Sequence, residues 1–191
     1  MGRQLTIFDD EAYGEVREGG SLYLKADQIA RMVDHCAHSI NSNFAFDEEE
    51  PVVMVVLLSG AVPFATQLMQ KLHMPLEVRY VNVSVYGDDR TPDRAKILYD
   101  VEGLDDLEGR KVLLVDELAD SGTTLTLVQE YIEKKGAESI YSSTLLYRGG
   151  CTFTPDVVGH VATISDWFYG YGMDLDGMNR NLPDIYTTPA C

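Results

Sequence analysis

The chain has 191 residues, 45% hydrophobic and 24% charged, which is typical of one globular domain. Its 31 acidic and 15 basic residues give a formal net charge of -16, which opposes binding to nucleic acid and to anionic membrane surfaces. Three widely spaced cysteines, Cys36, Cys151 and Cys191, predict reduced thiols in a cytoplasmic protein, and no apolar run is long enough to span a bilayer.

Helical and strand patterns alternate along most of the chain. Apolar residues recur at helical spacing over 25–41, and the continuous aliphatic run 52–58 is typical of a strand buried on both faces of a parallel sheet. The elements expected after these are a helix over 63–73, strands over 78–85 and 111–115, a helix over 123–135 and a strand over 139–146. The alternation predicts an α/β fold with a doubly wound, mostly parallel sheet.

The last 40 residues have a different character, with clustered aromatic residues and glycines and little helical period. They predict a small loop-rich hood of short strands. We therefore expect one domain over 1–191, with a core over about 25–150 and a hood formed by about 151–191 together with the N-terminal segment.

The most informative motif joins the strand 111–115 to the helix that follows. The strand leads into two adjacent acids, Asp116 and Glu117, and a turn of small polar residues over 120–124 then opens the helix. Carboxyl ends of strands bind ligands in α/β sheets, and free amides at a helix start bind phosphate. The alternative is an ordinary capping turn, with Asp120 or Ser121 as N-cap. The chain has neither the glycine-lysine pair of a Walker P-loop nor the third glycine of a dinucleotide fingerprint.

This segment resembles the phosphoribosyl-pyrophosphate motif of type I phosphoribosyltransferases. The resemblance implies that Asp116 and Glu117 face the ribose hydroxyls, in an order inverted from the usual Glu-Asp. It also implies that Asp120 is the general base near N7 of a purine. The residues implied to hold the 5′-phosphate are Asp120, Ser121, Gly122, Thr123 and Thr124.

The segment 166–175, followed by Arg180, is similar to the hypoxanthine-guanine branch of that family. By this similarity Trp167 stacks on the purine ring and Phe168 offers its backbone to the base edge. Asp174 lies near the base and a metal-bound water, and Arg180 lies near the pyrophosphate. Tyr169 and Tyr171 are interpreted instead as core residues.

Arg148 follows the strand 139–146, where relatives usually carry a lysine that donates to the purine 6-oxo group. The arginine can donate to the same oxygen. The alternative is that Arg148 is a solvated surface residue.

Two further segments match the family. Leu58-Ser59-Gly60 resembles its pyrophosphate loop, in which the first peptide bond can be cis, and the amides of Ser59 and Gly60 would bind the diphosphate. The segment 84–97 resembles its flexible loop, with Val85 in place of the usual serine and Tyr86 retained. The alternative for the second segment is an ordinary exposed loop.

The resemblance implies a transferase that joins hypoxanthine or guanine to phosphoribosyl pyrophosphate, giving IMP or GMP and pyrophosphate. It implies Mg²⁺ near Asp116, Glu117 and Asp174, and a homodimer or homotetramer. Two alternatives remain: a transferase for xanthine, adenine or a pyrimidine, and a non-catalytic nucleotide-sensing regulator of the same fold.

Overall fold

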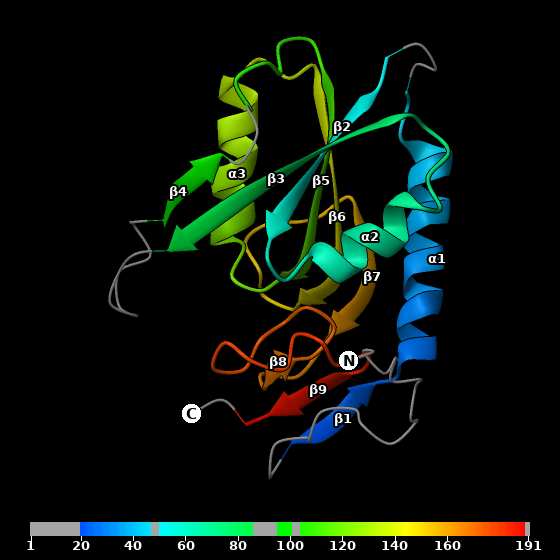
Figure 1. Ribbon diagram of the computed structural model, residues 1–191, viewed down its shortest axis with the longest axis vertical. Coiled ribbons are helices and arrows are strands. Elements are labelled where there is room, and N and C mark those ends of the chain that lie inside the picture. The colour runs from blue at the N-terminus through cyan, green and yellow to red at the C-terminus, as the bar shows by residue number, and fades with distance from the viewer. Residues whose placement is uncertain (1–19, 47–49, 86–94, 101–103, 190–191) are drawn as a thin grey trace, which may run out of the picture.

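The structure, a computed structural model, describes residues 20–46, 50–85, 95–100 and 104–189. Its larger sheet has six strands in the order β4-β3-β2-β5-β6-β7, and β4 alone is antiparallel to its neighbour (Figure 1). The strands are β2 (Val52–Leu58), β3 (Leu76–Val85), β4 (Ala95–Asp100), β5 (Lys111–Ala119), β6 (Ser139–Arg148) and β7 (Val157–Ala162). The prediction of a mostly parallel sheet is confirmed.

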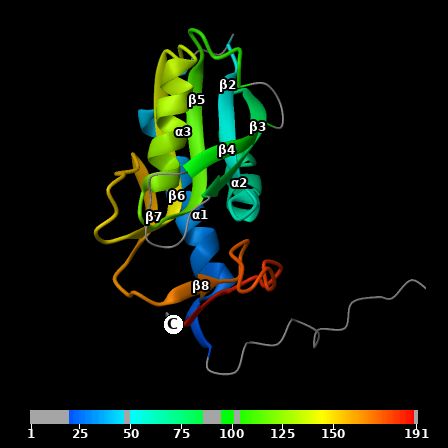
Figure 2. The same ribbon diagram turned by 90° about the vertical axis from the view of Figure 1, so that its left-hand side faces the viewer.

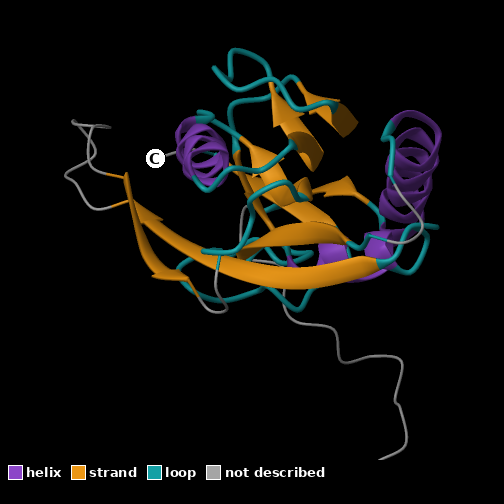
Figure 3. Ribbon diagram, turned by 90° about the horizontal axis from the view of Figure 1, so that it is seen from above, coloured by secondary structure: helices purple, strands orange, loops and turns teal. Residues whose placement is uncertain are grey.

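Helices cover both faces of this sheet, as a view from above shows (Figure 3). They are α1 (Ala26–Asn43), α2 (Val62–Met69) and α3 (Thr123–Lys134). On one face, α1 and α2 pack on alternate residues of β2, such as Met54. On the other face, α3 packs on the residues between, such as Val53 and Val55. Successive residues of a strand point to opposite faces, so an all-aliphatic β2 serves two cores.

A second sheet of three short antiparallel strands lies beyond the carboxyl ends of β2, β5, β6 and β7 (Figures 1 and 2). It pairs β1 (Ser21–Leu24) with β9 (Ile185–Thr188), and β9 with β8 (Trp167–Tyr169). The N-terminal and C-terminal parts of the chain therefore build the hood together, as expected.

The expected start of the hood at about residue 151 is wrong, because β7 still belongs to the large sheet. We use the word hood below for residues 20–24 and 163–189. Other boundaries also differ from the prediction, and the largest differences are that β5 continues to Ala119, that α2 ends at Met69 and that residues 95–97 begin strand β4. None of the helices in the described ranges has the length and apolar character needed to cross a membrane.

Hydrogen bonds from both of its chain segments fasten the hood to the core. The amide of Ala26, at the start of α1, donates to the Asp184 carboxylate at 2.7 Å. The hydroxyl of Tyr23 on β1 is 3.0 Å from His160 Nε2 on β7, and the Tyr23 ring packs against that of Phe168 with centroids 5.1 Å apart. These contacts set the position of the hood above the strand ends.

Candidate active site

A pocket of about 300 Å³ opens between the carboxyl ends of the large sheet and the hood. It brings together predicted residues that lie more than 100 positions apart in the chain. Those that line it are Ser59, Gly60, Asp116, Glu117, Asp120, Thr124, Arg148, Trp167, Phe168, Asp174 and Arg180.

A smaller hollow of about 70 Å³ adjoins this pocket at the 120–124 turn, which we call the phosphate turn. Asp116, Asp120 and Thr124 line both spaces, and Ser121 and Gly122 line the hollow. One continuous site thus runs from the turn to the hood.

The backbone amides of the phosphate turn are available to a ligand. In the described part of the chain, the amides of Ser121, Gly122 and Thr124 have no hydrogen-bond acceptor, whereas that of Thr123 donates to Ser121 Oγ at 3.3 Å. Gly122, with φ of 91°, precedes the first residue of α3. Free amides at the start of a helix are suited to binding phosphate. Thr123 lines neither space, and its hydroxyl accepts a hydrogen bond from Ser121 Oγ.

The two adjacent acids occupy different parts of the site. Asp116 is buried and lines both the pocket and the hollow, while Glu117 is half-buried and lines the pocket alone. The Glu117 carboxylate lies against the pyrophosphate loop: a Cβ added to Gly60 would be 1.8 Å from Glu117 Oε1. Burial, and then the neighbouring Glu117 carboxylate, raise the pKa of Asp116 well above its ordinary value.

The pyrophosphate loop, Leu58-Ser59-Gly60, turns sharply at the end of β2. Its Leu58–Ser59 peptide bond is cis, a conformation that the resemblance of this segment had left open. Ser59 and Gly60 line the pocket, and the loop also contacts the hood, since a Cβ on Gly172 would be 2.0 Å from the Gly60 carbonyl oxygen.

Arg148 is held in place by residues of both core and hood. Its Nε donates to the Asp120 carboxylate, and its terminal nitrogens donate to the carbonyls of Ile164 and, at 3.1 Å, of Asp166. The guanidinium also lies over the Phe168 ring, 4.9 Å from the centroid. With its side chain only 18% exposed, Arg148 is not the solvated surface residue of the alternative interpretation.

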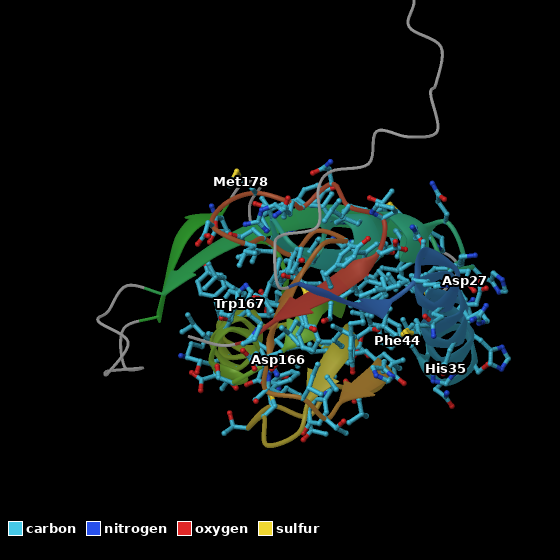
Figure 4. The ribbon with its side chains drawn as sticks, turned by 90° about the horizontal axis from the view of Figure 1, so that it is seen from below. Asp27, His35, Phe44, Asp166, Trp167 and Met178 are labelled. Atoms are coloured by element: carbon cyan, nitrogen blue, oxygen red, sulfur yellow. The ribbon has the colours of Figure 1, made fainter. Side chains whose placement is uncertain are left out.

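The hood contributes an aromatic surface and an ion pair. Trp167 is 53% exposed, and its Nε1 donates to the Asp174 carbonyl at 3.0 Å. The Asp174 carboxylate is 2.7 Å from Arg180, which also donates to the Gly172 carbonyl. Figure 4, drawn from the hood side, shows Trp167 beside the hood strands. Tyr169 and Tyr171 are buried, which confirms their interpretation as core.

Residues 21–172 match the family model described as the phosphoribosyl transferase domain. The chain belongs to the phosphoribosyltransferase family. A hypoxanthine-guanine phosphoribosyltransferase of Aquifex aeolicus is 34% identical over 170 residues, which cover 86% of this chain and 92% of that protein. A protein of the same name from Mycobacterium avium is 29% identical, over 87% of this chain and 84% of its own length.

Solved structures that resemble this one come from the same family. The crystal structure of a hypoxanthine-guanine phosphoribosyltransferase from Bacillus anthracis, with a HEPES molecule in the active site, superposes with a TM-score of 0.79 at 25% identity. The match covers 91% of this chain and 99% of the other. The expected fold class and family are confirmed.

The acids of this phosphoribosyltransferase fit a magnesium ion that is carried mainly by a substrate. Mg²⁺ is usually bound by one or two carboxylates together with substrate phosphates and waters, rather than by an all-protein cage. Among the described residues, no cluster of three or more acidic, histidine or cysteine side chains could hold a metal ion, so the predicted donors Asp116, Glu117 and Asp174 do not form an all-protein metal site. The Asp116 and Glu117 carboxylates both line the pocket, and burial and mutual repulsion raise the pKa of Asp116, two effects that a bound cation would offset.

Sequence reasoning missed the apolar part of the pocket wall. The lining residues outside the prediction are Leu57, Leu58, Val83, Leu118 and Met173. Leu118 and Met173 could have been found from their places beside the predicted acids, whereas nothing in the local sequence marks Val83. In the predicted flexible loop, Val85 ends strand β3, and Tyr86 lies outside the described residues.

Proposed function

We propose that the chain transfers the phosphoribosyl group of phosphoribosyl pyrophosphate to hypoxanthine or guanine, giving IMP or GMP and pyrophosphate. The observation that carries this proposal is one continuous site with free turn amides at one end and an aromatic-lined pocket with an arginine at the other. The similarity to hypoxanthine-guanine phosphoribosyltransferases over most of the chain supports the same reaction.

The activated sugar would lie with its 5′-phosphate on the phosphate turn. Asp120, Ser121, Gly122, Thr123 and Thr124 form that turn, and we assign the free amides of Ser121, Gly122 and Thr124 to the phosphate oxygens. Thr123 would act through its hydrogen bonds with Ser121 rather than by direct contact.

The two acids of the inverted pair would contact different parts of the activated sugar. We assign Asp116 to the ribose hydroxyls, because it lines both the hollow and the pocket. Glu117 would face the diphosphate end of the ribose, because its carboxylate lies against Gly60. Ser59, Gly60 and Arg180 would bind the pyrophosphate, Arg180 through the planar fork that suits paired oxygens.

The purine would lie between the core and the hood. Trp167 is assigned to stacking, because its ring is exposed at the pocket and every flat base can use such a contact. The backbone of Phe168 would meet the base edge. The terminal nitrogens of Arg148 would donate to a 6-oxo oxygen. As a donor without acceptor capacity, arginine favours that oxygen over the amino group of adenine.

Asp120 is our candidate for the general base, acting near N7 of the purine as N9 attacks the ribose. Its carboxylate accepts a hydrogen bond from Arg148 Nε, which orients it beside the group that would read the purine. Carboxylates that flank the ribose stabilise the positive charge that develops as the bond to pyrophosphate lengthens. Val85 and Tyr86, the residues assigned by resemblance to the family's flexible loop, would exclude water from this step.

We also propose that the reaction depends on Mg²⁺, with Asp116, Glu117 and Asp174 as the protein's oxygen donors toward it. The ion would supply charge neutralisation for the pyrophosphate leaving group. Free Cys36 and Cys151 are in keeping with a cytoplasmic protein. We propose a homodimer or homotetramer, which light scattering would report as two or four times the chain mass of 21.3 kDa.

A spectrophotometric assay of hypoxanthine, guanine, xanthine and adenine with phosphoribosyl pyrophosphate, with and without Mg²⁺, tests the proposal. We expect turnover of hypoxanthine and guanine only when the metal is present. Turnover of adenine instead would indicate another transferase of the family. No turnover of any base, together with tight nucleotide binding, would indicate a regulator.

A further inference from the structure

The connection between β6 and β7 lies directly behind the phosphate turn. Two donors of Thr152, its backbone amide and its hydroxyl, reach the carbonyl oxygen of Ser121 at 3.1 and 2.8 Å. A carbonyl oxygen has two lone pairs, so these two donors satisfy it fully. The carbonyl of Ser121 is therefore fixed in direction.

The two segments also touch through their backbones. A Cβ added to Gly122 would lie 2.6 Å from the amide nitrogen of Phe153 and 2.8 Å from Thr152 Oγ1. The turn and the connection are therefore too close for a side chain to fit between them at position 122. The connection thus packs directly against the phosphate turn.

The direction of the Ser121 carbonyl determines what the turn offers on its other side. In a planar trans peptide, the carbonyl and the following N–H point in opposite directions. Holding the Ser121 carbonyl toward Thr152 aims the Gly122 N–H away from the connection. Gly122 lines the hollow, and its amide has no acceptor in the part of the chain that the structure describes.

We infer that Thr152 is a positioning residue, which orients the Gly122 amide toward the 5′-phosphate of the activated sugar without touching that sugar. The inference rests on the proposed function, because it presupposes a phosphate on the turn. Substitution of Thr152 should change the affinity for the sugar phosphate but not the affinity for the base, since Thr152 does not line the pocket that would hold the base.

Replacing Thr152 by valine tests the inference, because valine keeps the shape and the backbone amide but loses the hydroxyl. The dissociation constant for phosphoribosyl pyrophosphate with Mg²⁺, measured by calorimetry, should rise about three- to tenfold, the usual range for one hydrogen bond. The KM for guanine should stay unchanged. Thr152→Ser keeps the hydroxyl and should bind as the wild type does.

Thr154→Val provides the matched control. Thr154 lies in the same connection and is also exposed, but its hydroxyl makes no hydrogen bond among the described residues. It should leave the affinity unchanged. If Thr152→Val does not fold, as judged by its melting curve, Thr152→Ala replaces it, with the same expected loss of affinity.

Unchanged affinity in Thr152→Val, or in Thr152→Ala where that variant replaces it, would overturn the inference alone, and so would an equal rise in the KM for guanine. Wild-type protein that fails to bind phosphoribosyl pyrophosphate would overturn the proposed function, and the inference with it.

Discussion

At the scale of single residues, the site depends on backbone atoms that approach one another very closely. Gly60 lies between the Glu117 carboxylate on one side and Gly172 of the hood on the other. Any side chain at position 60 would occupy the space of that carboxylate. The glycine therefore allows an acid of β5 and the pyrophosphate loop to share one small volume.

We expect Gly60→Ala to displace Glu117, because the added Cβ would lie 1.8 Å from its Oε1. The KM for phosphoribosyl pyrophosphate should rise at least about tenfold, as expected when a close charged contact is misplaced. Gly149→Ala is the control, since its Cβ would meet nothing within 4 Å. Steady-state kinetics with the sugar varied would measure both, and an unchanged KM for Gly60→Ala would contradict the placement of Glu117.

Asp120→Asn tests the general base with little change of geometry, because the amide oxygen can still accept the hydrogen bond from Arg148. We expect kcat to fall by about 10² to 10⁴, while the affinity for phosphoribosyl pyrophosphate stays close to that of the wild type. Asp106→Asn, at an exposed position, is the control and should keep full activity. A normal kcat in Asp120→Asn would remove this role from Asp120.

At the scale of elements, α3 contributes to stability through a buried face that reaches the site only at its first residue. The buried residues of α3 are Leu125, Val128 and Ile132. Leu125 lines the hollow at the start of the helix, whereas Ile132 lies two turns further on and packs in the second core. Function and stability can thus be separated along one helix.

Ile132→Ala should lower the free energy of unfolding by about 2 to 5 kcal/mol, because Ile132 is fully buried and the truncation leaves a cavity. Thr126→Ala, at an exposed position of the same helix, should change it by less than about 0.5 kcal/mol. Urea denaturation measures both. If Ile132→Ala were as stable as Thr126→Ala, the described packing of α3 would be wrong.

Sequence periodicity identified the central elements but not the edges of the sheets. The aliphatic run of β2 is visible in the sequence because both of its faces are buried. By contrast, β7 was not predicted, since its Val157–Ala162 segment includes a glycine and a histidine and becomes a strand by pairing with β6. The four residues of β1 likewise depend on β9, about 160 positions away.

At the scale of the whole molecule, a network of charges lies at the opposite end of the sheet from the pocket. Glu77, at the start of β3, accepts hydrogen bonds from Arg79 Nε at 2.9 Å and from an Arg110 terminal nitrogen at 2.9 Å. Arg110 also donates to the Pro51 carbonyl, before β2. The network joins the beginnings of three strands, β2, β3 and β5.

Glu77→Gln should reduce stability at pH 7 by about 1 to 2 kcal/mol, a modest figure because Glu77 is 43% exposed and solvent weakens its ion pairs. Arg110, and then Arg79, lower the pKa of Glu77 below its ordinary 4.5. The stabilisation is therefore complete above the unfolded pKa and disappears as the pH falls through the folded one. Urea denaturation would measure the free energy of unfolding at pH 7 and at about pH 3. The difference in this free energy between variant and wild type should be smaller at the lower pH.

Glu130→Gln, in an exposed pair with Lys134, is the control for this experiment. It should change stability little at either pH. If the loss of unfolding free energy in Glu77→Gln became larger toward acid pH, the lowered pKa assigned to Glu77 would be wrong. The kcat of Glu77→Gln at neutral pH should remain that of the wild type, because the network and the pocket share no residues.

The sequence by itself predicted the alternating fold and the phosphate turn with its two acids, because periodicity and turn chemistry act over a few residues. The other residues gathered in the pocket were named only through the resemblance of their segments to a known family, since they lie far apart in the chain. Only the tertiary structure decided that Asp116 lines the hollow while Glu117 meets Gly60, that Arg148 joins Asp120 to the hood, and that Thr152 holds Ser121. These contacts join segments far apart in the chain, and their geometry depends on how the strands pair and how the hood packs on them.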